Sequence, residues 1–129
     1  MTPVKLTWAG GEHRFCLRMG ELRGLQQSRD AGPEEILNRL RMGRWHVDDM
    51  VQVLRWGLIG AEEKDADAAG PFVTELVDLH PLSQFKLTAI AVLIHAMFGD
   101  GDGNEKKPEG GAADPLENGT SPTSTETAP

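Results

Sequence analysis

Residues 47–60 of this chain read VDDMVQVLRWGLIG. The large apolar residues of this stretch recur at intervals of three and four, which is the spacing of one face of an α-helix. These residues are Val47, Met50, Val51, Leu54 and Leu58. Gly60 marks the expected end of the helix. Because glycine inside a helix costs about 1 kcal/mol relative to alanine, we interpret Gly57 as a close helix crossing or an early helix end rather than a hinge.

Two further helices are predicted before this stretch. Residues 20–30 carry leucines three positions apart, and a break at residues 30–32 follows them. Pro33 then stands at a first-turn position, and the two glutamates after it lie where the positive end of a helix dipole favours acidic side chains. This second helix is expected to stop near Gly43.

Two more helices are predicted after residue 60. The polar residues 62–67 form the expected connection, and the apolar pattern over residues 72–79 predicts a fourth helix that ends before Pro81. Residues 82–98 predict a fifth helix, which is apolar over most of its circumference from Ala89 onward. Because a helix that is apolar on all sides must be surrounded, we expect this one at the centre of the bundle.

The N-terminal residues show the period-two pattern of β-strands. Residues 4–8, VKLTW, alternate apolar and polar side chains, and residues 13–17, HRFCL, follow the Gly10-Gly11 turn. Two such runs around glycines predict a β-hairpin. An isolated hairpin is marginal in water, so its apolar face must pack on another element. The predicted fold class is therefore mainly α: an N-terminal β-hairpin followed by a compact bundle of about four to five short helices.

The charge of the chain is concentrated near its C-terminus. The 129 residues include 13 basic and 20 acidic side chains, and this net charge of -7 argues against an electrostatic nucleic-acid binder. Residues 99–129 hold seven of the acids and only two lysines, with Leu116 as their only large apolar residue. So little apolar surface cannot offset the entropy of ordering a chain. We expect one folded domain over residues 1–98 and a disordered acidic tail over residues 99–129.

Targeting and membrane signals are not evident in the sequence. The first twenty residues lack a charged segment followed by an apolar run, and no window reaches the roughly 18 apolar residues that a membrane helix needs. Cys16 is the one cysteine, so no intramolecular disulfide can form. These features predict a cytoplasmic protein with no membrane partner and no nucleic-acid partner.

Candidate reactive groups do not form a recognisable site in the sequence. Cys16 lies in a short strand, which is a poor place for the pocket of a nucleophile. Residues 100–105, DGDGNE, match the start of an EF-hand loop, but Glu105 replaces the required glycine and Gly111 the bidentate glutamate. The four histidines are far apart, and none is paired with a carboxylate at helical spacing: His13, His46, His80 and His95. We therefore predict no catalytic residue, no cofactor and no bound metal.

Two charged groups have simple structural interpretations. Adjacent residues on a helix point about 100° apart, so Asp48 and Asp49 are interpreted as an N-cap and a first-turn acid rather than as a catalytic pair. A basic and aromatic cluster surrounds them in the sequence, but residues 1–60 carry a net charge of only +2. We interpret this cluster as a solvated helix face beside two packing tryptophans: Arg39, Arg41, Arg44 and Arg55, with Trp45 and Trp56.

Short motifs in a fixed order run along residues 3–99. They include Gly20-Glu21-Leu22, Trp45-His46-Val47-Asp48-Asp49, Gly57-Leu58-Ile59-Gly60 and Pro81-Leu82. The set resembles a family of small proteins of gene transfer agents and tailed phages that are classed with tail assembly chaperones. That family shares the short hairpin, a G-E-L-x-x-L helix, an R-x-G-L-I-G signature and a closing apolar helix.

The resemblance implies a non-enzymatic role in building a tail. Such chaperones bind the tape measure protein and keep it soluble while tail tube subunits polymerise around it, so the implied partners are the tape measure protein and the tail tube protein. One alternative is a structural minor tail or head-tail joining component of the particle, although a tube-forming protein normally needs a large β-sheet. A small cytosolic protein-binding adaptor is a second alternative.

The tryptophan-rich region supplies the candidate partner-binding residues. It concentrates more large apolar side chains than one helix face can bury. We therefore hypothesise a partner face at Trp45, Trp56, Leu58 and Ile59. The alternative that all four belong to the core stays open at this point.

Overall fold

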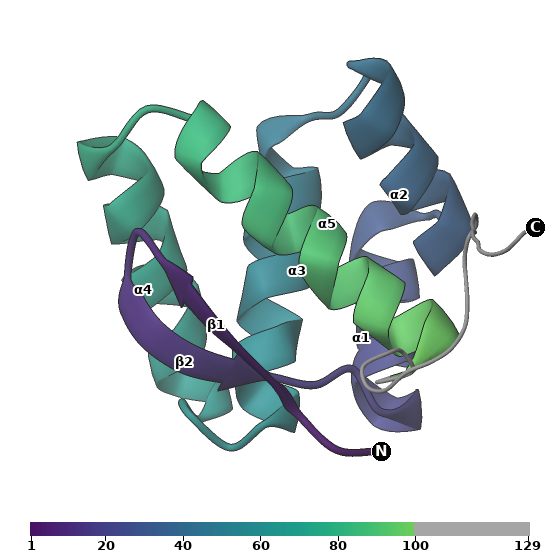
Figure 1. Cartoon of the computed structure of the whole chain (residues 1–129), viewed down its shortest axis with the longest axis horizontal. Coiled ribbons are helices and arrows are strands. Elements are labelled where there is room, and N and C mark those ends of the chain that lie inside the picture. The colour runs from purple at the N-terminus through teal and green to yellow at the C-terminus, as the bar shows by residue number, and fades with distance from the viewer. Residues whose placement is uncertain (100–129) are drawn as a thin grey trace, which may run out of the picture. The chain divides into compact units, whose positions relative to one another are not determined.

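The computed structural model describes residues 1–99 and has the predicted fold class, a hairpin followed by five helices. Figure 1 shows their arrangement. The elements are β1 (Val4–Trp8), β2 (Gly11–Phe15), α1 (Met19–Arg29), α2 (Pro33–Met42), α3 (Val47–Gly60), α4 (Ala66–Leu79) and α5 (Ser83–Phe98). The expected tail at 99–129, with its EF-hand-like residues, lies outside the described residues apart from Gly99, so the domain boundary stays a prediction.

The hairpin forms with a tight turn. β1 and β2 are antiparallel, with Val4 opposite Phe15 and Trp8 opposite Gly11. Gly11 has a φ of 107°, a conformation that favours glycine. The second strand starts at this glycine and ends at Phe15. Both of its ends therefore lie two residues earlier than in the expected strand 13–17.

An aromatic cluster holds the hairpin against the helices. Such a contact is predicted because an isolated hairpin is only marginally stable in water. The Trp8 ring meets three phenylalanine rings edge to face, at centroid distances of 5.5 Å for Phe15, 6.2 Å for Phe72 of α4 and 6.2 Å for Phe85 of α5. The indole N–H of Trp8 donates to Nδ1 of His13 at 2.9 Å. Edge-to-face pairs stabilise beyond their buried area, so Trp8 joins the hairpin to both of the last two helices.

Local capping signals place most helix ends where the sequence predicted them. Pro33 is the first residue of α2, and Gly43 follows the helix with a φ of 73°. The start of α4 differs: the Asp65 side chain accepts a hydrogen bond from the Ala68 N–H at 2.8 Å. This cap lets the helix begin at Ala66, so the last two residues of the expected polar connection are helical.

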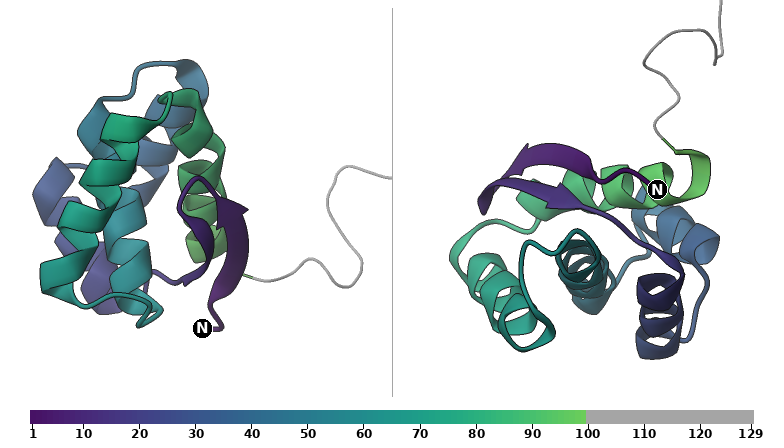
Figure 2. Two further views of the ribbon diagram at one scale, coloured as in Figure 1. Left: turned by 90° about the vertical axis from the view of Figure 1, so that its left-hand side faces the viewer. Right: turned by 90° about the horizontal axis from the view of Figure 1, so that it is seen from below.

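The central position belongs to α3 rather than to the last helix. α3 lies between α1 and α4 and is crossed by β2, whereas the hairpin and α5 lie together on one side of it (Figure 2). Leu87 on α5 is 75% exposed, so the prediction that residues 82–98 are surrounded is wrong. The physical reason is that α3 carries glycines, which other elements approach closely, while α5 turns only one side toward the core.

Candidate protein-binding surface

Trp56, one of the four expected partner residues, packs mainly within the molecule. A Cβ added at Gly24 of α1 would lie 2.5 Å from Cζ2 of Trp56, so the indole lies directly against this glycine. The Arg55 guanidinium lies 4.6 Å from the Trp56 ring centre, a cation–π contact. The ring is half-buried, and its indole N–H is buried with no acceptor among the described residues. Trp56 therefore joins α1 to α3.

The other three expected partner residues differ in exposure. Leu58 is completely buried in the core, so its assignment to a partner face is corrected here: a side chain at that point of α3 faces inward. Trp45 and Ile59 are half-buried, and Trp45 packs against the core. The four residues thus do not form one exposed surface.

The glycines at the end of α3 mark a close crossing with β2 and the residues after it. The N–H of Cys16 donates to the carbonyl of Gly57 at 3.0 Å. A Cβ added at Gly57 would lie 3.0 Å from a ring carbon of Phe15. A Cβ added at Gly60 would overlap the carbonyl oxygen of Cys16. The expectation of a close crossing at Gly57 therefore holds, although the crossing element is a strand.

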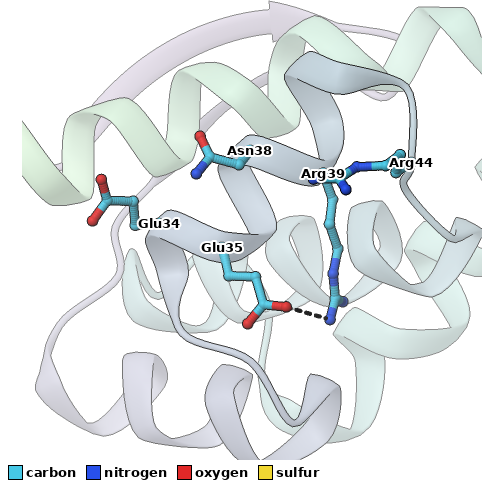
Figure 3. A pocket seen from close by; sticks show the side chains of 5 residues that line it. All are labelled: Glu34, Glu35, Asn38, Arg39 and Arg44. Carbon is cyan, nitrogen blue, oxygen red and sulfur yellow. Dashed lines mark hydrogen bonds and ion pairs between the residues drawn. The ribbon is translucent and has the colours of Figure 1, made fainter.

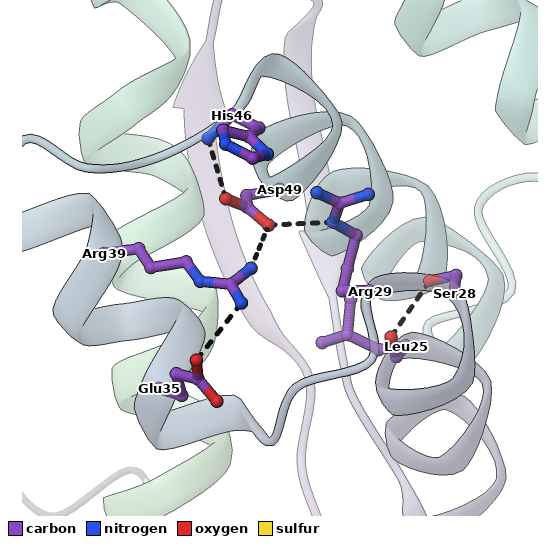
Figure 4. Close-up of polar contacts among 7 residues, drawn as sticks. All are labelled: Leu25, Ser28, Arg29, Glu35, Arg39, His46 and Asp49. Atoms are coloured by element: carbon purple, nitrogen blue, oxygen red, sulfur yellow. Dashed lines mark hydrogen bonds and ion pairs between the residues drawn. The ribbon is translucent and has the colours of Figure 1, made fainter.

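The acidic start of α3 forms a buried ion-pair network that the sequence did not predict (Figure 4). Asp49 is completely buried, and one of its oxygens accepts from Arg29 at 2.8 Å and from Arg39 at 3.0 Å. Its other oxygen accepts from the backbone N–H of His46 at 2.8 Å. His46 is therefore the residue that precedes the helix, and neither Asp48 nor Asp49 is its N-cap.

The balance of these contacts sets the charge of Asp49. Burial by itself raises the pKa of this carboxyl, but the N–H of His46 and the two arginines oppose it, so the pKa lies below its usual value. The carboxylate therefore stays charged and ties α1, α2 and α3 together. The spacing of three between His46 and Asp49 is typical of a capping box. It could have predicted the contact between these two residues, but not the two arginines.

The basic and aromatic cluster does not form a patch. Arg39 is paired with Asp49 and with Glu35 of its own helix, the latter at 3.1 Å, and Arg55 lies over Trp56. Figure 3 shows a depression on α2 in which Glu35 and Arg39 point toward one another. Its lining carries both signs of charge: Glu34, Glu35, Asn38, Arg39 and Arg44. Such a mixed surface lacks the concentrated positive charge of a nucleic-acid site.

The remaining candidate groups are dispersed. Cys16 is buried after the end of β2, and His80 bonds the carbonyl of Leu76 at 3.0 Å. Within residues 1–99, no three histidine, cysteine or acidic side chains are grouped so that they could hold a metal ion. Over the same residues, every helix is too short or too polar to cross a membrane.

The outer side of α5 is the apolar surface that sequence reasoning missed. Leu87 is 75% exposed, and the residues three, four and seven positions later, Ile90, Ala91 and Ile94, are half-buried. From Leu87 to Met97 the helix contains no acidic residue, lysine or arginine. The sequence signal for this surface is the apolar circumference of the helix, which predicts burial where the structure has an open apolar side.

Residues 2–99 are similar to a known protein family. A family model described as "Phage tail tube protein, GTA-gp10" matches residues 2–99. The chain belongs to this family. Searches of curated proteins and of solved structures found no match. Membership covers the whole described part of the chain and supports a protein of phage or gene transfer agent tails.

Packing explains the Gly-Leu-Ile-Gly segment of this GTA-gp10 family member. Gly57 and Gly60 lie three residues apart on the side of α3 that β2 crosses, and Leu58 between them fills the core. Side chains at the two glycine positions would block the strand from approaching the helix. The segment that suggested a partner face thus stabilises the fold.

Replacing Trp56 with alanine tests whether this family member uses the ring for packing. We expect the free energy of unfolding to fall by about 2 kcal/mol, because a half-buried ring that fills the space over Gly24 is removed. For a domain of this size, the melting temperature should drop by about 10 °C. Thermal unfolding followed by circular dichroism measures the effect. An unchanged melting temperature with loss of partner binding would instead mean that Trp56 lies in the interface with the partner.

Proposed function

We propose that this GTA-gp10 family member is a non-enzymatic tail assembly chaperone. It binds the tape measure protein in the cytoplasm and keeps it soluble while tail tube subunits assemble around it. The observation that carries the proposal is a small helical domain whose most apolar helix, α5, leaves one side open. Partners rich in amphipathic helices expose apolar stripes, which such a helix can cover.

The small sheet supports a chaperone over a tube subunit. Within residues 1–99 the sheet has two strands. Its aromatic side chains, Trp8 and Phe15, pack in the cluster that joins the hairpin to the helices. A subunit that closes a ring through strand pairing needs a larger sheet with edges free to pair with its neighbours. The hairpin here serves the fold of its own chain.

A structural component of the tail is the second candidate function. The family description, which names a tail tube protein, favours it. The two functions differ in where the chain is found after assembly: a structural component stays in the finished particle at a fixed ratio to other tail proteins, and a chaperone leaves. Family membership also favours either tail function over a general cytosolic adaptor.

Co-expression with the tape measure protein tests the chaperone proposal. We expect the soluble fraction of the tape measure protein to rise severalfold when this chain is present, because the chain covers apolar surface that otherwise aggregates. Centrifugation followed by quantitative mass spectrometry measures the fraction, and co-expression of an unrelated helical protein of similar size is the control.

The protein content of purified particles separates the two functions. A chaperone should be nearly absent from particles that contain the tape measure and tube proteins. If the chain is instead present in a fixed, tube-like ratio, the structural function replaces the chaperone.

A further inference from the structure

The outer side of α5 carries a row of apolar residues with a regular spacing. Leu87, Ile90, Ala91 and Ile94 stand at positions i, i+3, i+4 and i+7 and form what we call the outer row. The opposite side of the helix faces the core, where Phe85, Ala89 and Leu93 are completely buried. Ile90 and Ile94 also pack in part against the core. The second apolar surface of this helix therefore consists of Leu87 and the parts of the two isoleucines that stay exposed.

Folding of this domain accounts for the outer row only in part, because Ile90 and Ile94 are half-buried and pack against the core. Leu87 keeps three quarters of its surface exposed, so it adds little burial, and a helix at the surface normally carries charged side chains on its outer face. Here the segment from Leu87 to Met97 has none. A contiguous apolar surface without charges is typical of a site that another protein covers.

We propose that the outer row docks one amphipathic helix of a partner protein, with the apolar side of that helix against Leu87, Ile90 and Ile94. The spacing of the row is the one by which helices recognise partners, and its length of about 10 Å corresponds to two turns. The proposal rests on the proposed chaperone function and identifies the surface that performs it.

Size and charge favour a partner helix over a second copy of this chain. A stable dimer needs about 800 Å² of surface from each partner, and a row about 10 Å long and one helix wide offers far less. Two copies that each carry a net charge of -7 also repel one another. A small uncharged contact is instead suited to a partner that must be released when the tail is complete.

The test compares two leucines of equal exposure on different helices. Leu87 and Leu79, at the end of α4, are 75% and 69% exposed, so neither substitution by glutamate should unfold the protein. The full chain, Leu87→Glu and Leu79→Glu are each tagged, and retention of the co-expressed tape measure protein is measured. We expect Leu87→Glu to retain at least tenfold less than the wild type and Leu79→Glu to stay within about twofold. Leu87→Ala, with an expected threefold loss, covers the case in which glutamate disturbs the fold.

Each outcome separates the docking surface from the function. If the wild type retains the tape measure protein and both Leu87 variants retain it equally well, the outer row is not the docking site, although the chaperone function stands. If the wild type itself retains none, the proposed function fails and the docking proposal fails with it. If the wild type sediments as a dimer that Leu87→Glu converts to a monomer, the occupant is a second copy and the proposed partner helix is wrong.

Discussion

The Gly60→Ala variant should lose about 3 kcal/mol of its free energy of unfolding, or fail to fold. The added methyl group would overlap the carbonyl oxygen of Cys16. Because this neighbour is backbone rather than a flexible side chain, the residues that follow β2 would have to move away from α3. That movement would also break the hydrogen bond from the Cys16 N–H to the Gly57 carbonyl, now 3.0 Å long. Urea unfolding followed by tryptophan fluorescence measures the change.

Gly20→Ala is the matched control for this prediction. Gly20 lies in the first turn of α1, and an added Cβ there meets nothing within 4 Å. The expected result is no loss, or a gain of up to about 1 kcal/mol from the higher helix propensity of alanine. A Gly60→Ala protein as stable as Gly20→Ala would mean that β2 does not cross α3 this closely.

The elements themselves could be predicted because their signals are local. Pro33 at the start of α2 and Gly43 after its end act within a few residues of where they stand. The same holds for the hairpin, where alternation and two glycines suffice. The start of α4 differs from the prediction because Asp65, a good N-cap residue, lies within a polar stretch that by itself indicates a connection.

The placement of the helices could not be predicted in the same way. Periodicity reports which sides of a helix are apolar, but it does not report which other element covers each side. α5 has the most apolar circumference, yet α3 lies at the centre because Gly57 and Gly60 let β2 cross it. That α5 has an open apolar side therefore follows from its place in the fold and not from its periodicity.

The candidate partner residues show the same limit at the level of side chains. Trp56 and Leu58 look alike in a list of large apolar residues, but one lies half-buried against Gly24 and the other is completely buried. Which of them faces outward depends on residues far away in the sequence. Leu87, whose exposure is greater than either, stands between Lys86 and Thr88, and no local signal marks it as an exposed apolar side chain.

The Asp49→Asn variant should lose about 3 kcal/mol of its free energy of unfolding. The substitution keeps the size of the side chain but removes the charge that Arg29 and Arg39 face, and these arginine side chains are only 15% and 23% exposed. Breaking a buried ion pair in this way is costly because the remaining charges lose their partner without regaining water. Asp48→Asn is the control, since Asp48 is exposed at the preceding position of the same helix turn. This substitution should cost less than about 1 kcal/mol, through the helix dipole.

The pH dependence of unfolding gives this prediction a second, independent readout. The pKa of Asp49 in the folded protein lies below its ordinary value despite burial, because the His46 N–H, Arg29 and Arg39 favour the charged form. A carboxyl with a lowered pKa stabilises the fold above its unfolded-state pKa of about 3.9, and this contribution disappears as the pH falls further through the folded-state pKa. The wild type should therefore lose stability relative to Asp49→Asn as the pH falls below about 4. In plots of the free energy of unfolding against pH, the curves of the two proteins should converge in acid. If the free energies of unfolding of the two proteins instead differ by the same amount down to the lowest pH at which both fold, Asp49 is not charged in the native structure.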